Sequence, residues 1–317
     1  MTMRKMFFVV ALVCAVMSCT KHDPFDKLND NEEVWILSKF VEGDVQTISS
    51  EGVSFLANDT QFRTDESYYS HRQLNDAGLL KAVVKDEDGN CYRMPTAGEL
   101  KMIFPRINYD DVQPGLNMSS ILIFGWSPVQ DDVFRTKETA YLDNKEDYSA
   151  DTDGDVISGD SEFYYDEDYE DNNPDFFPIY ALRFKGTSQY AAYRYDLIEV
   201  RQAVGNFGPT YGFRLKARWL KAADVTTTMD DLKKPSYWEG DCLELVFPIT
   251  GYVGANGFIG GYDGRLLSST LEKDYDDSYV PIVGIYTLWE AGMGVDYKSM
   301  SYKYALRLLK CKSDGKL

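Results

Sequence analysis

The chain has 317 residues, 44% of them hydrophobic, which is enough to fill the core of one large domain or two small ones. Its formal net charge of −18 repels the phosphates of DNA and RNA, so we expect no nucleic-acid partner. Only two histidines occur, His22 and His71, which nearly excludes a histidine-based catalytic triad or a multi-histidine metal site.

The N-terminus is typical of a targeting segment. Arg4 and Lys5 precede an unbroken apolar run over residues 6–17. This run is too short to cross a membrane comfortably, and no later apolar run reaches a membrane-spanning length. The first residues therefore predict export from the cytoplasm.

Residues 16–19, Val-Met-Ser-Cys, resemble a bacterial lipobox. The resemblance implies cleavage after Ser18 and attachment of lipid to Cys19, which would anchor the protein to a membrane. On this interpretation residues 1–18 are a lipoprotein signal peptide, and the polar residues 19–32 are a tether. The alternative is an ordinary signal peptide cut nearby, with Cys19 as a free thiol.

Short strands are predicted over the next hundred residues. We expect the first part, residues 33–79, to form an N-terminal β segment before the main domain at 80–317. The predicted strands cover residues 34–40, 52–56 and 120–126, and a short apolar run at 79–84 precedes a turn at 88–90.

The stretch Cys91–Phe104 predicts a strand that runs directly into a helix. Thr96 is a good N-cap residue, and Glu99 three residues later completes a capping box. Apolar residues at 100, 103 and 104 give the helix one buried face, and Pro105 ends it.

Residues 143–175 form an acidic insertion. They contain fourteen Asp or Glu and one Lys, a net charge of −13, which leaves −5 for the rest of the chain. Such a segment is too polar to contribute much to a core, although the aromatic residues Phe163, Tyr164, Tyr165 and Tyr169 could let part of it pack.

The chain after the insertion is predicted to be β. Residues 179–185 and 190–200 indicate a hairpin, and Phe213–Leu220 alternates apolar and basic side chains as a half-buried strand does. Residues 243–247 and 304–311 predict further strands. Between them, the Gly-rich residues 251–264 predict an irregular region.

Asp151, Asp153, Asp155 and Glu162 have the spacing of positions 1, 3, 5 and 12 of an EF-hand-like loop. However, Val156 occupies the position where Gly normally makes the sharp turn. We therefore favour a solvated acidic loop over a Ca²⁺ site, and we expect no cofactor beyond weakly bound Ca²⁺.

Aromatic side chains could bind glycans by stacking, but core packing is the favoured interpretation for each of them. The residues concerned are Tyr190, Tyr193, Tyr195, Tyr252, Tyr262 and Trp289.

Four stretches in order resemble the fibrobacter-type major paralogous domain, found in fimbrillin-like and adhesion-type surface lipoproteins of gut Bacteroidetes. That family is similar to C-type-lectin-like folds. The stretches are residues 92–100 (YRMPTAGEL), 247–252 (FPITGY), 267–270 (LSST) and 304–312 (YALRLLKCK). They cover roughly residues 80–312, although Leu267 replaces the Trp of the third motif and the acidic insertion is extra.

The resemblance implies an α+β, C-type-lectin-like domain, mostly antiparallel β with one or two short helices and long irregular loops. It also implies a non-catalytic outer-membrane lipoprotein, exposed at the cell surface, that acts in adhesion or as a tip or accessory subunit of a fimbria. Pilin subunits are then the expected partners. The alternative is a glycan-binding lipoprotein of a carbohydrate-uptake system, with host or dietary glycans as partners.

In C-type-lectin-like folds a cysteine near the first helix is often bonded to one in the final strand. Cys91 and Cys311 occupy matching places, so the resemblance implies a disulfide between them. Enzymes with a related fold act through cysteine, but no matching motif surrounds Cys242 or Cys311.

Overall fold

The computed structural model describes most of the chain after residue 33, and Val34–Leu317 forms one compact unit. The N-terminal β segment expected at 33–79 shares the hydrophobic core of the main domain. The described residues are 34–56, 67–105, 121–123, 133–142, 156–166, 178–201, 210–220, 226–259, 263–270, 279–287, 292–299 and 301–317.

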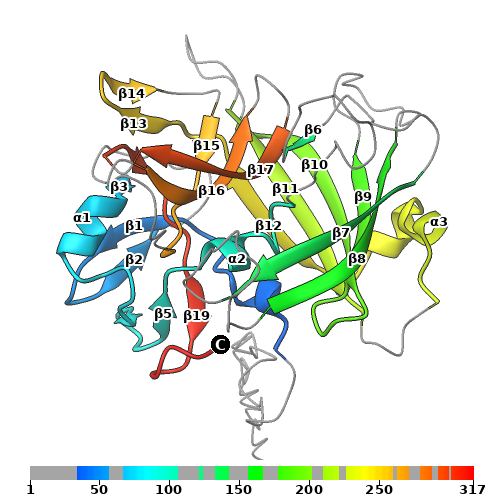
Figure 1. The fold of residues 1–317 in the computed structure, drawn as a ribbon, viewed down its shortest axis with the longest axis horizontal. Helices are drawn as coiled ribbons and strands as arrows, with labels where there is room; N and C mark the ends of the chain where they lie inside the picture. The colour runs from blue at the N-terminus through cyan, green and yellow to red at the C-terminus, as the bar shows by residue number, and fades with distance from the viewer. Residues whose placement is uncertain are drawn as a thin grey trace, which may run out of the picture. The chain divides into compact units, whose positions relative to one another are not determined.

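The largest element is a six-stranded antiparallel sheet in which each strand pairs with its neighbours in the sequence (Figure 1). The strands are β7 (Phe134–Tyr141), β8 (Val156–Tyr165), β9 (Ile179–Lys185), β10 (Ala191–Arg201), β11 (Thr210–Trp219) and β12 (Leu243–Pro248). Apolar side chains of alternate residues point into the main core, and charged residues alternate with them in β11, as predicted for Phe213–Leu220. On β9 and β10 the other face carries a second apolar cluster, in which Tyr180, Leu182 and Ala192 pack with Met229, Leu232 and Trp238.

Part of the acidic insertion belongs to this sheet, and it packs through two of the aromatic residues that the sequence singles out. Phe163 and Tyr165 of β8 are buried in the main core. Acidic side chains on the other face of β8 lie opposite basic ones across the ladder, because Glu162 pairs with Arg135 and Asp160 lies opposite Lys137. Cross-strand charge pairs of this kind let an acidic sequence form a regular strand.

The other described strands form three smaller sheets and a two-stranded ribbon, and β16 (Tyr279–Thr287) of one of these sheets contacts the short helix α2 (Ala97–Leu100). Their mostly antiparallel arrangement with few, short helices agrees with the predicted β-rich class. Their strands are β1 (Val45–Ile48), β2 (Val53–Phe55), β3 (Tyr69–Ser70), β4 (Val84–Lys85), β5 (Cys91–Arg93), β6 (Ile121–Ile123), β13 (Tyr252–Gly254), β14 (Gly257–Ile259), β15 (Asp263–Arg265), β16 (Tyr279–Thr287), β17 (Gly292–Ser299), β18 (Lys303–Tyr304) and β19 (Leu309–Cys311).

The helices are short. Besides α2 they are η1 (Ile36–Lys39), α1 (His71–Asp76), α3 (Met229–Leu232) and η4 (Pro235–Trp238). None of the described helices has the length and apolar character needed to cross a membrane.

The first predicted strand, residues 34–40, is instead the 3₁₀ helix η1. Its large apolar residues are consecutive rather than alternating, and a strand would leave half of them in water. The Gln189 side chain takes the place of a neighbouring strand, because it accepts a hydrogen bond from the Ile36 N–H (2.9 Å) and donates one to the Val34 carbonyl (2.7 Å).

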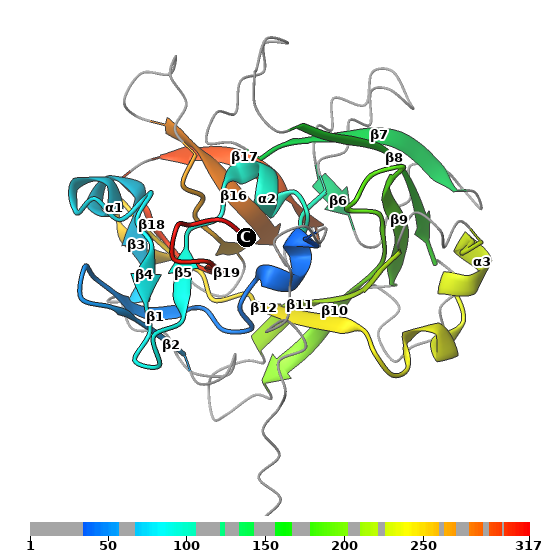
Figure 2. The same cartoon turned by 90° about the horizontal axis from the view of Figure 1, so that it is seen from below.

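The last predicted strand, residues 304–311, is divided into β18 and β19 by residues 305–308, which are all buried. Arg307 lies here and pairs with Asp44, with its Nε 2.7 Å from the Asp44 Oδ1. Leu306 and Leu308 accept backbone hydrogen bonds from Val45 and Val41. The N-terminal segment therefore packs on the C-terminal one, and Figure 2 shows η1 beside β19 and the C-terminus.

Arg183 of β9 is fully buried and connects the six-stranded sheet to the turn after α2. Its guanidinium contacts both carboxylate oxygens of Glu138 in β7, at 2.7 and 2.8 Å. It also donates hydrogen bonds to the carbonyls of Lys101 and Met102, and to the Tyr195 hydroxyl. Although burial alone would lower it, the carboxylate of Glu138 holds the pKa of Arg183 above its ordinary value.

We predict that Arg183→Met destabilises the protein by about 3–5 kcal/mol, because it leaves the Glu138 carboxylate buried without a partner. Arg135→Met is the matched control. It breaks the Arg135–Glu162 pair on the exposed face of the same sheet and should cost less than about 1 kcal/mol. Urea unfolding of both variants measures the difference, and equal losses would show that the buried pair has no special weight.

His71, the first residue of α1, generates a second prediction. Burial lowers the pKa of His71 from 6.5 to about 4, against a smaller opposing effect of the Thr270 backbone. A histidine that is harder to protonate when folded stabilises the fold fully above pH 6.5, and this contribution disappears as the pH falls toward 4. We expect a loss of about 2 kcal/mol at pH 5 relative to pH 7.5.

The measurement is the free energy of unfolding at both pH values for the parent protein and for His71→Gln, which does not titrate. Between pH 7.5 and pH 5, the free energy of unfolding of the parent should fall by about 2 kcal/mol more than that of His71→Gln. Equal slopes in the two proteins would rule out this role for His71.

Candidate functional site

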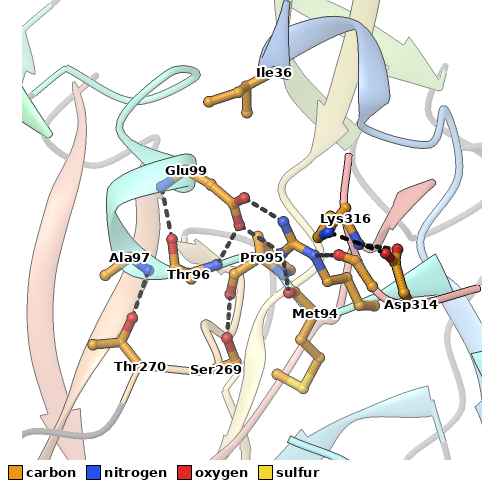
Figure 3. Close-up of polar contacts among 12 residues, drawn as sticks. Ile36, Met94, Pro95, Thr96, Ala97, Glu99, Ser269, Thr270, Asp314 and Lys316 are labelled. Atoms are coloured by element: carbon orange, nitrogen blue, oxygen red, sulfur yellow. Dashed lines mark hydrogen bonds and ion pairs between the residues drawn. The ribbon is translucent and has the colours of Figure 1, made fainter. Parts of the chain in front are cut away.

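The predicted strand–helix start is present, and Figure 1 draws α2 near the middle of the described unit. Figure 3 shows its polar contacts. The Thr96 side chain accepts a hydrogen bond from the Glu99 N–H at 3.1 Å, and the Glu99 carboxylate accepts one from the Thr96 N–H at 2.8 Å. Gly98 is required here, because a Cβ at this position would lie 1.7 Å from the Tyr141 carbonyl oxygen.

Arg93 joins this helix start to the end of the chain. Its guanidinium forms a two-pronged ion pair with Glu99, at 2.5 and 2.8 Å, and its Nε donates to the Gly315 carbonyl at 2.8 Å. Such paired hydrogen bonds fix both side chains in orientation as well as in distance. Arg93 and Glu99 therefore serve the architecture of the site.

The third motif docks on the same helix start. The Ala97 N–H donates to the Thr270 Oγ1 at 2.8 Å, and the Ser269 N–H and hydroxyl both donate to the Pro95 carbonyl (Figure 3). Gly251 of the second motif turns the chain with φ +83°, a conformation open chiefly to glycine. These motif residues are thus brought together, but their polar groups are occupied by one another.

Cys91 and Cys311 are direct partners across the β5–β19 ladder, and both are free thiols in the structure. Partner Cα atoms in an antiparallel pair lie about 4.5 or 5.5 Å apart. Both separations fall within the range of about 4.4–6.8 Å that a disulfide bridges. Burial raises the pKa of the Cys311 thiol to about 11, so the thiolate that starts oxidation is scarce at neutral pH.

The proposed Ca²⁺ ligands fall in two different settings. Asp151, Asp153 and Asp155 lie outside the described residues, and Glu162 lies within β8, where it pairs with Arg135. The extended strand from Val156 to Glu162 spans roughly 20 Å. This distance does not support Glu162 as a ligand of the same ion as Asp155, and no group of three potential metal ligands occurs among the described residues.

The aromatic residues are placed as the packing interpretation predicts wherever they are described. Tyr190, Tyr193 and Tyr195 are buried. Tyr262 and Trp289 lie outside the described residues, as do Cys19 and the whole of residues 1–33.

Tyr252 is fixed at the base of the β13–β14 hairpin. Its ring stacks on Tyr302 and on Tyr304, with 6.0 Å between ring centroids in each case. The Arg265 guanidinium lies 3.9 Å from the centroid of the Tyr252 ring and is held by Asp263 at 2.7 Å. Tyr252 therefore braces the hairpin and offers no open ring face to a sugar.

The outer strand of this hairpin is exposed. Phe258 has 55% of its surface accessible, the highest value among the large apolar residues described. Ile259 and Val156 of β8 follow with 43% each. The edge of the Phe258 ring contacts Tyr68, whose hydroxyl donates to the Thr250 carbonyl. Two apolar side chains thus project from a braced hairpin, which makes them the best candidates for binding a partner.

Sequence reasoning treated this region only as an irregular Gly-rich loop. The signal that could have identified it is the absence of charge, because residues 251–262 (GYVGANGFIGGY) contain none in a chain that is 26% charged. The two-residue turn at Ala255–Asn256 between short β-like runs was a second signal.

Residues 46–309 match the family model described as Domain of unknown function (DUF8237). The comparisons with curated proteins and with solved structures find no match.

We predict that Cys91 and Cys311 form a disulfide under oxidising conditions, as their register allows. Closing a loop of roughly 220 residues should raise the free energy of unfolding by about 5 kcal/mol on the chain-entropy model. Non-reducing peptide mapping identifies the bond, and unfolding with and without reductant measures its effect. Cys242→Ser should change neither result, and a bond that contains Cys242 would contradict the assignment.

Proposed function

The chain belongs to the DUF8237 family, a domain of unknown function, and we propose that it is a lipid-anchored cell-surface protein that acts by binding a partner in adhesion or in fimbrial assembly. The observation that carries the proposal is the braced, uncharged hairpin of β13 and β14 with its exposed Phe258 and Ile259.

The position of the hairpin supports its role as a contact. Figure 1 draws β13 and β14 at the periphery of the described unit, and β14 is the end strand of its sheet. Phe258 and Ile259 are therefore accessible to other molecules.

We also propose a C-type-lectin-like arrangement for residues 80–317. Two features support it: β5 and β19 pair near the two ends of the domain, and Ser269 and Thr270 dock on the start of α2. From the same resemblance we propose that the protein is a surface lipoprotein of the outer membrane.

The test uses the full-length protein expressed in a bacterium that exports lipoproteins and assembles the pilin subunits under study. Co-purification of these subunits and adherence of the cells are measured. The double variant Phe258→Asp/Ile259→Asp should reduce at least one of these by several-fold, because it places charge on the contact surface. Val156→Asp, at an apolar residue of the same exposure as Ile259 on β8, should reduce neither.

Anchoring is tested in the same cells. Cys19→Ala should move the protein out of the membrane fraction or leave it unprocessed. Unchanged membrane partitioning of this variant would contradict lipidation, and unchanged adherence and co-purification in the double variant would contradict the hairpin as the contact. Binding on a glycan array that survives the double variant would favour the glycan-uptake alternative.

A further inference from the structure

β14 is the end strand of its sheet, whose order is β14-β13-β18-β3. Gly257, Phe258 and Ile259 are all exposed, and among the described residues β14 pairs with β13 alone, which leaves the outer edge of the strand without a partner there. A two-residue turn joins Gly254 and Gly257, which form the hydrogen-bonded pair that closes the hairpin. Hydrogen-bonded and non-hydrogen-bonded pairs alternate along an antiparallel ladder, so the next pair, Val253 and Phe258, is not hydrogen-bonded. The N–H and carbonyl of Phe258 therefore point away from β13, toward the open edge.

This edge lacks the protection found at the edges of the six-stranded sheet. At one of those edges, β7 carries the exposed charged residues Arg135 and Lys137, and at the other, β12 carries Glu244 and ends in Pro248. Charges and proline prevent unwanted strand pairing. Neither β13 nor β14 contains a charged residue or a proline. Of the features that protect an edge strand, β14 has only its short length.

The charge of the molecule indicates what binds there. Two copies of a chain with net charge −18 repel each other, which disfavours self-pairing. A neutral edge on a chain of net charge −18 suits an apolar segment with basic flanks, since the segment fills the uncharged strip and the net negative charge attracts the flanks. Sugar stacking is disfavoured at Tyr252, because Arg265 and two tyrosines cover its ring.

We propose that β14 accepts an extended segment of another protein as an added strand, with the backbone of Phe258 supplying hydrogen bonds and the side chains of Phe258 and Ile259 supplying apolar contact. The segment is apolar at alternate positions and flanked by basic residues. This inference rests on the proposed partner-binding function and adds the mode of binding and the chemistry of the partner.

The experiment measures binding of a synthetic peptide, Lys-Lys-Val-Thr-Val-Thr-Val-Lys-Lys, to the full chain by fluorescence anisotropy. The matched variants are Phe258→Val and Phe258→Pro, which place apolar side chains of similar size but differ in the outward N–H. Proline is tolerated on an edge strand where the N–H faces solvent. Phe258→Pro should bind at least tenfold more weakly than Phe258→Val.

A second measurement does not depend on the folding of either variant. The peptide N-methylated at its central valine, which cannot donate to a neighbouring strand, should bind the parent protein at least tenfold more weakly than the unmodified peptide. Equal binding of both peptides, or equal binding by both variants, would overturn strand addition. Sedimentation with phosphatidylcholine vesicles, reduced equally by both substitutions, would instead identify a lipid surface as the partner and would also overturn it.

The two proposals fail in different ways. If the double Asp variant loses adherence while peptide binding is insensitive to the backbone changes, the hairpin is a contact surface but not a strand acceptor. If the double Asp variant keeps adherence and co-purification, the proposed function itself is wrong.

Discussion

The buried ion pair between Arg183 and Glu138 is the constraint on which the rest of the described structure depends. Removing a guanidinium and a carboxylate from water is costly, and only close, paired geometry with further hydrogen bonds offsets it. Arg183 meets this requirement by also binding the carbonyls that follow α2. The pair therefore fixes β7, β9 and the end of α2 in one arrangement, because any shift would expose an unpaired charge to the core.

Around this pair, the fold connects residues that are far apart in the sequence. Arg93 links the cap of α2 to the C-terminal turn, and Arg307 links the last segment to Asp44 near the start of the described chain. Each arginine shares its donors between a carboxylate and a backbone carbonyl. This use of arginine suits an irregular β fold, since a single planar group can satisfy several loop groups that no regular ladder would reach.

The motif residues and the exposed surface have different roles. Thr96 and Glu99 satisfy each other, and Ser269 and Thr270 bond to the backbone of Pro95 and Ala97, which ties residues 269–270 to the start of α2. The β13–β14 hairpin is held at its base by the packing of Tyr252 against Arg265 and Tyr304. A rigid base with an apolar, uncharged tip costs little conformational entropy on binding, which is an advantage for a contact surface.

The sequence by itself determined the features that depend on neighbours within a few residues. The capping box of Thr96 and Glu99, the alternation of Phe213–Leu220 and the turn before Asn90 are local patterns, and the structure contains them. Only the tertiary structure decided that residues 36–39 form a 3₁₀ helix, that the acidic β8 is part of the main sheet and that Arg183 is buried, because Gln189, Arg135 and Glu138 lie 153, 27 and 45 residues away, respectively. The exposure of Phe258 and Ile259 was likewise invisible in the sequence, since it depends on which strands pair with β13 and on none pairing with the outer edge of β14 among the described residues.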